Sequence, residues 1–242
     1  MTTCIVIPAR MSSTRLPNKP LLDICGKPMI ERVYEQAVKS KLANKVYFAI
    51  CDKELKNAID LFNGNYIMTR NEHTSGTDRI EEAISNIECD LVINLQGDEP
   101  LINPNYIDKL IKLFENKDIY MASLMVNISD EEAENPNQVK VVCDKNNYAL
   151  YFSRAKIPFS RNEFNNYLGH IGIYGYRKEF LRKYAKQPKT PYEKGESLEQ
   201  LRVLENGYNI KMLKVNEKPL GVDTLEDYEN VCQIFKERMY QR

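Results

Sequence analysis

The chain has 242 residues, which is enough to form one large domain or two small ones around a substantial hydrophobic core. Its 34 basic and 34 acidic side chains balance, whereas a general nucleic-acid or membrane-surface binder carries a broad basic excess. The charge balance therefore argues against both of these classes. No stretch is long and apolar enough to predict a transmembrane helix.

Six cysteines are scattered singly, without a CxxC pair or an adjacent histidine. This pattern argues against a zinc site and favours buried thiols in a reducing compartment. The first residues, MTTCIVIPAR, lack the basic segment and the long apolar run of a secretory signal. We therefore expect a cytoplasmic protein.

Apolar runs alternate with amphipathic stretches in the first half of the chain. The apolar runs predict four strands, at residues 4–9, 45–50, 65–69 and 90–96. The amphipathic stretches predict helices at residues 28–40, 53–62, 76–87 and 103–116. Strands that alternate with helices over short connections predict βαβ units and a mainly parallel sheet, and buried parallel strands are continuously apolar, as these are.

The second half of the chain changes character. Three stretches resemble strands (120–128, 139–154 and 169–177), and DKNN within the second of them predicts a hairpin turn. Helices are predicted at 177–187, at 196–207 with a capping box from Ser197 to Gln200, and at 224–239, with one more strand at 209–215. The pattern predicts a single α/β domain, residues 1–242, with an inserted mixed-sheet region.

Positive charge is concentrated in one loop. IPARMSSTRLPNKP follows the first predicted strand and contains three basic side chains, three prolines and no glycine. The phosphate-binding pattern GxxxxGK[ST] and the dinucleotide-binding pattern GxGxxG are both absent, which argues against an ordinary ATPase or dehydrogenase. In an otherwise neutral chain, such a local cluster of Arg and Lys indicates a specific phosphorylated ligand.

Carboxylates follow other strands of the predicted sheet. Asp98 comes after the fourth strand, in LQGDEP, and Asp223 comes after the last one, in GVDT. Ligands of open α/β sheets bind at the carboxyl ends of the strands, so these groups are expected to meet the basic loop there. Paired aspartates suit Mg²⁺, which prefers few carboxylates and retains water and phosphate oxygens. Taken singly, GDEP also fits a solvated turn, Asp223 a helix cap and His73 an exposed loop.

Seven motifs together resemble the 3-deoxy-manno-octulosonate (Kdo) cytidylyltransferase family. They follow one another in the order and spacing of that family over essentially the whole chain, and LQGDEP with YFSRAKIPF is the most specific combination. The motifs are IPARMSSTRLPNKPL, MTRNEHTSGTDRI, VINLQGDEPLI, YALYFSRAKIPF, HIGIYGYR, LEQLRVLENG and GVDTLEDYE.

The resemblance implies a Rossmann-like nucleotide-diphospho-sugar transferase fold and a homodimer formed through the inserted strand region at residues 120–177. It also implies the reaction CTP + Kdo → CMP-Kdo + pyrophosphate with Mg²⁺, in lipopolysaccharide biosynthesis. The anomeric 2-hydroxyl of Kdo would attack the α-phosphorus of CTP. Fixed cations that neutralise the triphosphate would supply much of the catalysis.

The resemblance also implies roles for individual residues. The residues expected to act in catalysis are Arg10, Lys19, Asp98 and Asp223, of which Asp98 and Asp223 would hold the metal. The nucleotide-binding residues would be Ala9, Arg10, Ser13, Lys19, Arg70, Ser75, Thr77, Asp78 and Arg79. The sugar-binding residues would be Gln96, Arg154, His170, Tyr174, Glu199 and Gln200.

Three alternatives remain open at this point. The first is a cytidylyltransferase for another acidic sugar, such as 8-amino-Kdo or a nonulosonic acid. The second is a GT-A glycosyltransferase, which shares this kind of sheet and also uses metal-bound carboxylates. The third is a nucleotide sensor that binds CTP without turnover. Release of pyrophosphate from CTP and Kdo would separate the enzyme from the last two.

Overall fold

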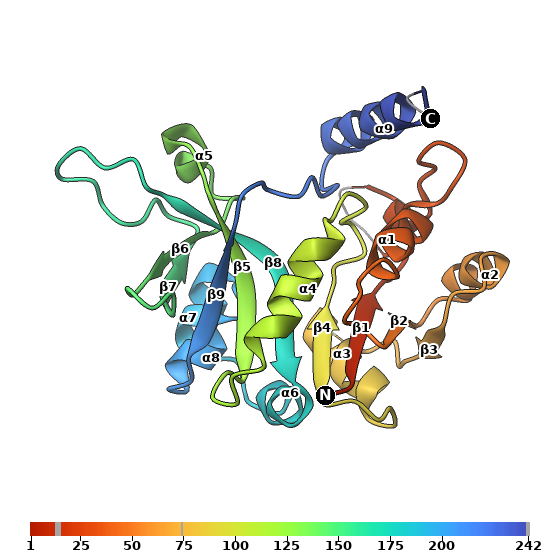
Figure 1. Cartoon of the computed structure of the whole chain (residues 1–242), viewed down its shortest axis with the longest axis horizontal. Coiled ribbons are helices and arrows are strands. Elements are labelled where there is room, and N and C mark those ends of the chain that lie inside the picture. The colour runs from red at the N-terminus through yellow and green to blue at the C-terminus, as the bar shows by residue number, and fades with distance from the viewer. Residues whose placement is uncertain (13–15, 74, 241–242) are drawn as a thin grey trace. The chain divides into compact units, whose positions relative to one another are not determined.

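The computed structural model describes residues 1–12, 16–73 and 75–240, and it divides into two compact units (Figure 1). Unit 1 comprises residues 1–111 together with the C-terminal segment 219–242. Unit 2 comprises residues 112–218. The chain therefore leaves unit 1, forms unit 2 and returns to unit 1 near its end.

Unit 1 contains four parallel strands. They are β1 (Thr3–Pro8), β2 (Lys45–Ile50), β3 (Tyr66–Met68) and β4 (Leu91–Asn94), arranged in the order β3-β2-β1-β4. Three of them lie within the predicted runs, and β1 begins one residue before its run. The central strand β1 pairs on both sides, and Cys4 to Ile7 are fully buried. This burial on both faces explains why the sequence of β1 is continuously apolar rather than alternating.

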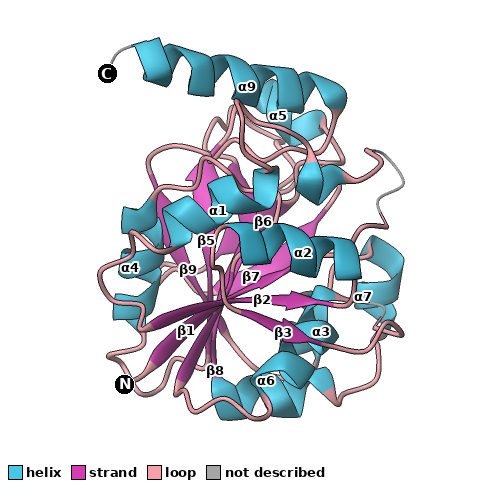
Figure 2. Ribbon diagram, turned by 90° about the vertical axis from the view of Figure 1, so that its right-hand side faces the viewer, coloured by secondary structure: helices cyan, strands magenta, loops and turns pink. Residues whose placement is uncertain are grey.

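Helices cover both faces of these strands. Figure 2 shows α1 (Met29–Ala37) and α2 (Lys53–Leu61) on one side and α3 (Gly76–Ile84) on the other. Each helix buries an apolar stripe at three- and four-residue spacing, for example Met29, Ile30, Val33 and Ala37 of α1. Helix α4 (Pro104–Leu113) begins with proline as predicted, and Asn103 Oδ1 accepts a hydrogen bond from Asn105 N (3.0 Å).

The C-terminal helix α9 (Leu225–Tyr240) packs on the segment that leads into α1. Its Val231 and Phe235 join Ile24 and Met29 in one buried apolar cluster. The Arg32 guanidinium lies 4.7 Å from the centre of the Phe235 ring and donates hydrogen bonds to Ile24 O. These contacts hold α9 against this segment, and Val222, which belongs to the same cluster, precedes Asp223 directly.

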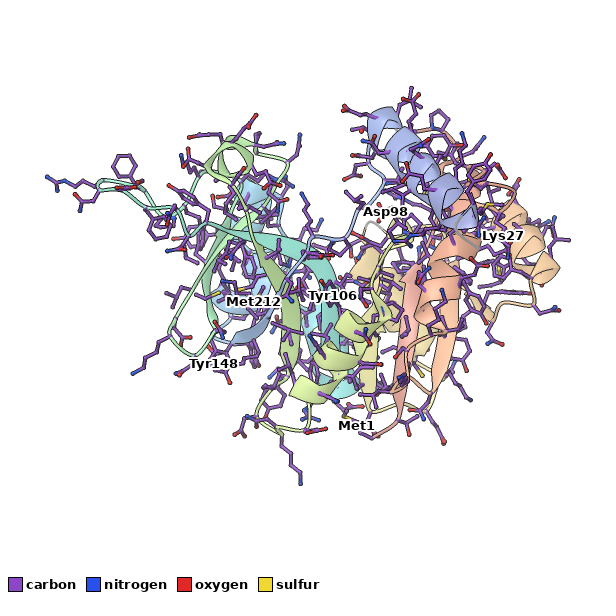
Figure 3. All side chains as sticks on the ribbon, turned by 45° about the horizontal axis from the view of Figure 1, so that its top comes forward. Met1, Lys27, Asp98, Tyr106, Tyr148 and Met212 are labelled. Carbon is purple, nitrogen blue, oxygen red and sulfur yellow. The ribbon has the colours of Figure 1, made fainter. Side chains whose placement is uncertain are left out.

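Unit 2 is built on a mixed sheet. Strand β5 (Met121–Asn127) pairs in parallel with β9 (Ile210–Val215) and antiparallel with β8 (Leu168–Arg177). Strands β6 (Lys140–Cys143) and β7 (Ala149–Ser153) form the predicted hairpin. Figure 3 marks Tyr148 and Met212, where Met212 N donates to Asn147 O (2.8 Å) and the Lys211 ammonium lies 4.6 Å from the centre of the Tyr148 ring.

One predicted helix start in unit 2 is wrong. The capping box forms at Thr190 and Glu193 and opens α7 (Pro191–Glu196), not at Ser197 and Gln200. Ser197 ends α7 in the left-handed conformation (φ 53°), so it cannot begin the next helix. Helix α8 (Leu201–Glu205) therefore starts later than predicted.

Three other helices complete the described elements. They are α5 (Asp130–Glu134) and α6 (Lys178–Ala185) in unit 2 and the short 3₁₀ helix η1 (Lys19–Leu21) in unit 1.

Two further findings concern expectations from composition. Within the described part of the chain, no helix has both the length and the apolar character needed to cross a membrane. All six cysteines are free thiols, but only Cys4 is fully buried, and the other five are partly exposed. The partial exposure of these five thiols differs from the prediction of buried cysteines.

Candidate active site

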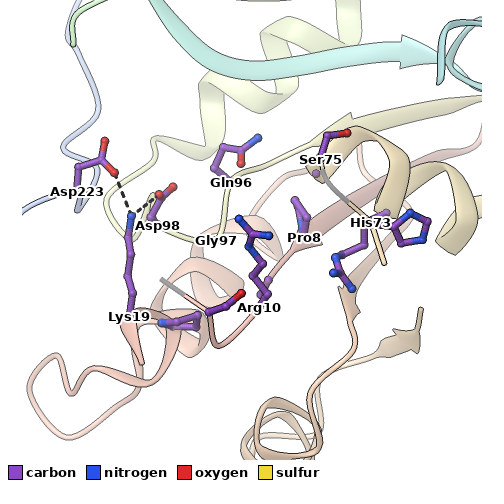
Figure 4. Close-up of a pocket in the computed structure, with 14 residues that line it drawn as sticks. Pro8, Arg10, Lys19, His73, Ser75, Gln96, Gly97, Asp98 and Asp223 are labelled. Atoms are coloured by element: carbon purple, nitrogen blue, oxygen red, sulfur yellow. Dashed lines mark hydrogen bonds and ion pairs between the residues drawn. The ribbon is translucent and has the colours of Figure 1, made fainter. Parts of the chain in front are cut away.

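A cavity of about 380 Å³ opens at the carboxyl ends of β1 and β4 in unit 1 (Figure 4). Its labelled residues extend from Asp223, Lys19 and Asp98 at one end to Ser75 and His73 at the other. The described residues that line it are Pro8, Ala9, Arg10, Ser12, Lys19, Pro20, His73, Ser75, Gly76, Arg79, Gln96, Gly97, Asp98 and Asp223. The predicted meeting of the basic loop with both aspartates is therefore observed.

Lys19 joins the two aspartates. Its Nζ lies 2.6 Å from Asp98 Oδ2 and 3.2 Å from Asp223 Oδ1, so both carboxylates face one ammonium group (Figure 4). Burial acts to lower the pKa of Lys19, but the charges of Asp98 and Asp223 outweigh this effect and raise the pKa above its ordinary value. The ammonium therefore stays charged at neutral pH.

The backbone holds the two aspartates in this arrangement. Val222 N donates a hydrogen bond to Asp98 O (2.9 Å), which ties the C-terminal segment to the loop after β4. Asp227 Oδ2 accepts hydrogen bonds from Asp223 N (3.0 Å) and Thr224 N (2.8 Å), and so anchors Asp223 at the start of α9. A Cβ atom at Gly97 would lie 3.2 Å from Pro8 O, so this close approach of the two loops favours glycine.

These donors fit Mg²⁺ better than a transition metal. The described residues contain no group of three or more His, Cys, Asp or Glu side chains that could hold a metal ion. Two carboxylates that already converge on one cation form a small hard-oxygen site, which leaves the other coordination positions of Mg²⁺ for water and phosphate. Asp98 and Asp223 therefore suit a Mg²⁺ ion that is shared with a phosphorylated ligand.

The opposite end of the cavity is built around the start of α3. The Ser75 side chain caps this helix by accepting a hydrogen bond from Asp78 N (3.1 Å). Arg79 lines the cavity although it is only 3% exposed, and its Nη1 donates to Thr69 Oγ1 (2.6 Å). A cationic group thus lies in the wall at this end as well.

Glu82 on α3 binds the loop that precedes the helix. Its carboxylate accepts hydrogen bonds from Arg70 N (3.1 Å), from Arg70 Nε (3.2 Å) and from the His73 ring at Nε2. Burial acts to raise the pKa of Glu82, but the hydrogen bonds from His73 and Arg70 outweigh it and lower the pKa. The ionised carboxylate therefore holds His73 in the cavity wall.

The other predicted nucleotide-binding residues occupy different positions. Among the described residues of this group, Arg70, Thr77 and Asp78 do not line the cavity. The Arg70 side chain is 74% exposed and pairs with Glu82, and Thr77 is buried. Ser13 lies outside the described residues. Gln96, predicted for the sugar, lines the cavity and donates to Asn94 Oδ1 (3.0 Å).

The remaining predicted sugar-binding residues belong to unit 2, where Arg154 is held firmly. Its Nε donates to Glu196 O (2.8 Å) and its Nη1 to Pro136 O (3.1 Å). Its backbone is fixed from both sides, because Arg154 N donates to Glu196 Oε2 (2.9 Å) and Arg154 O accepts from the Lys140 ammonium (2.5 Å). The guanidinium thus bonds to neutral carbonyls, and its positive charge remains available to an anionic group.

His170 and Tyr174 lie deeper in unit 2. His170 Nε2 is 2.8 Å from Ser123 Oγ, and the Tyr174 hydroxyl donates to Gln200 Oε1 (3.3 Å). The His170 ring contacts Phe152 edge-on and Tyr174 at a tilt, with ring centres 5.0 and 5.4 Å away. Gln200 is buried as well, and Glu199 O accepts a hydrogen bond from the Tyr184 hydroxyl (2.7 Å).

The burial of His170 predicts a loss of stability in acid. Burial lowers the pKa of His170 to about 3, while the unfolded chain binds this proton near pH 6.5. Between these values the unfolded state holds more protons, so the stability that neutral His170 contributes is complete above pH 6.5 and falls toward pH 3, by about 1.4 kcal/mol per pH unit.

Urea unfolding between pH 4 and 8, followed by circular dichroism, would measure this slope. We expect His170→Gln to be less stable than the parent at pH 7. Between pH 4 and 6, the free energy of unfolding of the variant should depend less on pH than that of the parent, because the contribution of His170 is gone. An unchanged slope in this variant would assign the acid sensitivity to other groups.

Sequence patterns missed several residues of the cavity. By sequence alone His73 also fits an exposed loop, and Ser12, Pro20, Gly76 and Gly97 carry no signal that marks them as cavity residues. The useful signal for His73 was its place after a predicted strand, in the same loop as Arg70. No local signal marks Glu82, because its role depends on how the loop folds back onto α3.

Comparison with known sequences gives a consistent result. Residues 4–214 match the family profile described as cytidylyltransferase. A 3-deoxy-manno-octulosonate cytidylyltransferase of Fusobacterium nucleatum is 52% identical over 236 residues, which covers 96% of each chain. The enzyme of the same name from Francisella tularensis subsp. novicida is 49% identical over 244 residues, which covers 96% of this chain and 97% of that protein.

Solved structures extend this result. The structure of CMP:2-keto-3-deoxy-manno-octonic acid synthetase in complex with CTP is 44% identical, covers 98% of this chain and 100% of that one, and aligns with a TM-score of 0.95. A 4-diphosphocytidyl-2C-methyl-D-erythritol synthase from Anaerococcus prevotii shares the fold at 14% identity, with a TM-score of 0.66 over 97% of this chain and 98% of that one.

Proposed function

This chain belongs to the 3-deoxy-manno-octulosonate cytidylyltransferase family, and we propose that the cavity of unit 1 is where it binds CTP. The reaction is the transfer of CMP from CTP to Kdo with release of pyrophosphate. The observation that carries the proposal is the convergence of Lys19, Asp98 and Asp223 in a cavity that Arg10 also lines. The predicted fold class, a Rossmann-like nucleotidyltransferase fold, is confirmed.

We propose that Arg10 and Lys19 bind the triphosphate. Both line the cavity, and cationic groups in that position neutralise the charge that develops on the phosphates as pyrophosphate leaves. Ala9 and Ser13, from the same loop, would contribute groups nearby. Three prolines limit the freedom of this loop, which reduces the ordering cost of binding.

The nucleoside would bind at the α3 end of the cavity. Ser75 and Arg79 line this end directly, which supports their assignment. Arg70, Thr77 and Asp78 would act from beside it, since Arg70 bonds to Glu82 and Asp78 N bonds to the Ser75 cap. The base and the phosphates would then occupy opposite ends of one cavity.

Asp98 and Asp223 would hold Mg²⁺ at the phosphate end. When bound, this ion neutralises phosphate charge and lowers the pKa of a hydroxyl that it contacts. The chain's own residues orient the reaction: Asp223 is fixed by Asp227, and Gln96 reaches the same cavity from the loop after β4. No side chain is assigned as a dedicated general base.

Each unit has residues that we assign to the sugar: Gln96 in unit 1, and in unit 2 the residues that follow. We assign Arg154 to the carboxylate of Kdo because its guanidinium is held only by neutral carbonyls of the described residues. Glu199 would act beside it. His170, Tyr174 and Gln200 would support this surface from within, since they bond to one another or to Ser123 in the interior of the unit.

Three broader assignments complete the proposal. They are a role in lipopolysaccharide biosynthesis, a cytoplasmic location and a homodimer formed through residues 120–177 of the single domain 1–242. The family membership supports the pathway. Exposed apolar side chains on this region, such as Leu150 and Phe159, support the dimer.

A substrate panel tests the proposed function. Four nucleoside triphosphates would be combined with Kdo, 8-amino-Kdo and sialic acid in the presence of Mg²⁺, and pyrophosphate release would be measured. CTP with Kdo is expected to give the highest kcat/KM. Turnover with another sugar but not with Kdo would contradict the assignment, and so would CTP binding without any release.

Loss of Glu82 is expected to weaken CTP binding selectively. Removing a charged acceptor that holds Arg70 and His73 would raise the KM for CTP about tenfold in Glu82→Ala. The kcat and the KM for Kdo should stay close to those of the parent. Glu81→Ala on the same helix is the matched control, and an equal effect in both variants would contradict the role of Glu82.

A further inference from the structure

Lys19 pairs with the two carboxylates that would also hold a shared metal ion. Its ammonium is bonded to Asp98 Oδ2 and Asp223 Oδ1 at 2.6 and 3.2 Å, and its side chain is only 15% exposed. A divalent cation held by the same two carboxylates would lie next to this ammonium and compete with it for their negative charge. Two cations at such close range repel each other, so the ion and the ammonium cannot both keep these contacts.

We propose that Lys19 is an exchangeable internal counter-ion, which pairs with Asp98 and Asp223 before a divalent cation binds and moves to the triphosphate when the cation replaces it. This inference rests on the proposed function of the cavity. In this role Lys19 acts before phosphate binds: its ammonium offsets the repulsion between the Asp98 and Asp223 carboxylates until a divalent cation binds them.

The backbone of Lys19 permits such an exchange. The residue begins the 3₁₀ helix η1, where Lys19 N donates to Leu16 O and Leu22 N donates to Lys19 O, both at 3.2 Å. The main chain is therefore fixed, while the four-carbon side chain can rotate. Lys19 lines the same cavity as Arg10, so the ammonium can turn toward bound phosphates without movement of the loop.

The exchange couples the two ligands. A metal ion that displaces Lys19 makes the ammonium available to phosphate, and phosphate that attracts Lys19 frees the carboxylates for metal. By linkage each ligand then strengthens binding of the other by the same factor. Removal of Lys19 should therefore have opposite effects: the metal alone should bind more tightly, and the nucleotide alone should bind more weakly.

Mn²⁺ binding to the full chain without nucleotide tests this inference. Electron paramagnetic resonance or calorimetry would give the Kd for the parent and for Lys19→Met. We expect the variant to bind Mn²⁺ more tightly, on the order of tenfold, because no ammonium competes for the carboxylates. In metal-free buffer with EDTA, the same variant should bind CTP at least about tenfold more weakly.

Arg10→Met is the matched control. Arg10 lines the same cavity and carries the same charge, but within the described chain it forms no ion pair with a carboxylate. Loss of Arg10 changes only the long-range electrostatic potential at Asp98 and Asp223. We therefore expect the Mn²⁺ affinity to change less than about threefold. Thermal unfolding of each variant checks the fold, and Lys19→Gln provides a second replacement.

Asp98→Asn and Lys19→Met test the metal site and the counter-ion role separately. Asp98→Asn should abolish the Mn²⁺ site in both the parent and the Lys19→Met background. If Asp98→Asn abolishes binding but Lys19→Met binds Mn²⁺ no more tightly than the parent or than Arg10→Met, the counter-ion role is overturned while the metal site stands. If Asp98→Asn leaves Mn²⁺ binding unchanged, the metal site itself is wrong, and the exchange fails with it.

Discussion

Asp98→Asn is expected to fold normally and to lose CMP transfer almost completely. The variant keeps the size of the side chain but removes the charge that faces Lys19 and that would hold the metal with Asp223. A metal contributes several kcal/mol to such a reaction, so we expect kcat to fall about 10³-fold or more. Pyrophosphate release with saturating CTP, Kdo and Mg²⁺ would measure this loss.

Two controls accompany this result. Asp223→Asn should show a loss of similar size, since both carboxylates face the same cation. Asp60→Asn removes a surface carboxylate that pairs only with Lys56 among the described residues, and it should leave kcat unchanged. Near-normal turnover in Asp98→Asn with Mg²⁺ would refute the proposed metal site.

Glu193→Ala is expected to destabilise unit 2 strongly. Glu193 and Arg202 form an ion pair in which each side chain is only 4% exposed, with Nη2 to Oε1 at 2.6 Å and Nε to Oε2 at 2.8 Å. Removal of one partner leaves the other charge buried without compensation, which costs about 3–5 kcal/mol. Urea or thermal unfolding, followed by circular dichroism, would show the loss.

The reason for the destabilisation can be tested with a second variant. Replacing both residues with Leu removes the two charges together, and it should restore much of the lost stability. Lys56→Ala breaks an exposed ion pair on α2 and should have no measurable effect on unfolding. If the double Leu variant were as unstable as Glu193→Ala, packing rather than charge would account for the effect.

The sequence predicts the parallel strands of unit 1 well, for a physical reason. Strands buried on both faces are continuously apolar, so β1 and β4 stand out from the helices around them. The prediction for residues 196–207 failed because Ser197 fits the start of a helix equally well by local composition. Only the preceding helix, opened at Thr190, determines that Ser197 is an end.

The site was partly predictable for a similar reason. The ends of parallel strands meet at one edge, which brought Lys19 and Asp98 together from positions 79 residues apart. The direct bond from Lys19 to both aspartates could not be predicted, because it depends on side-chain rotamers and on the return of the C-terminal segment. The role of Glu82 could not be predicted either, since its three hydrogen bonds depend on the path of the loop that carries Arg70 and His73.

The return of the chain to unit 1 also has a consequence for biosynthesis. Asp223 lies 204 residues after Lys19, so at about 5–20 residues per second a ribosome needs roughly 10–40 s to supply it. During this interval Ile24 and Met29 lack their α9 partners Val231 and Phe235, and an apolar surface stays open on the nascent chain. The cavity therefore cannot be complete before Asp223 and α9 have been synthesised, and until then the nascent chain exposes apolar surface that favours aggregation.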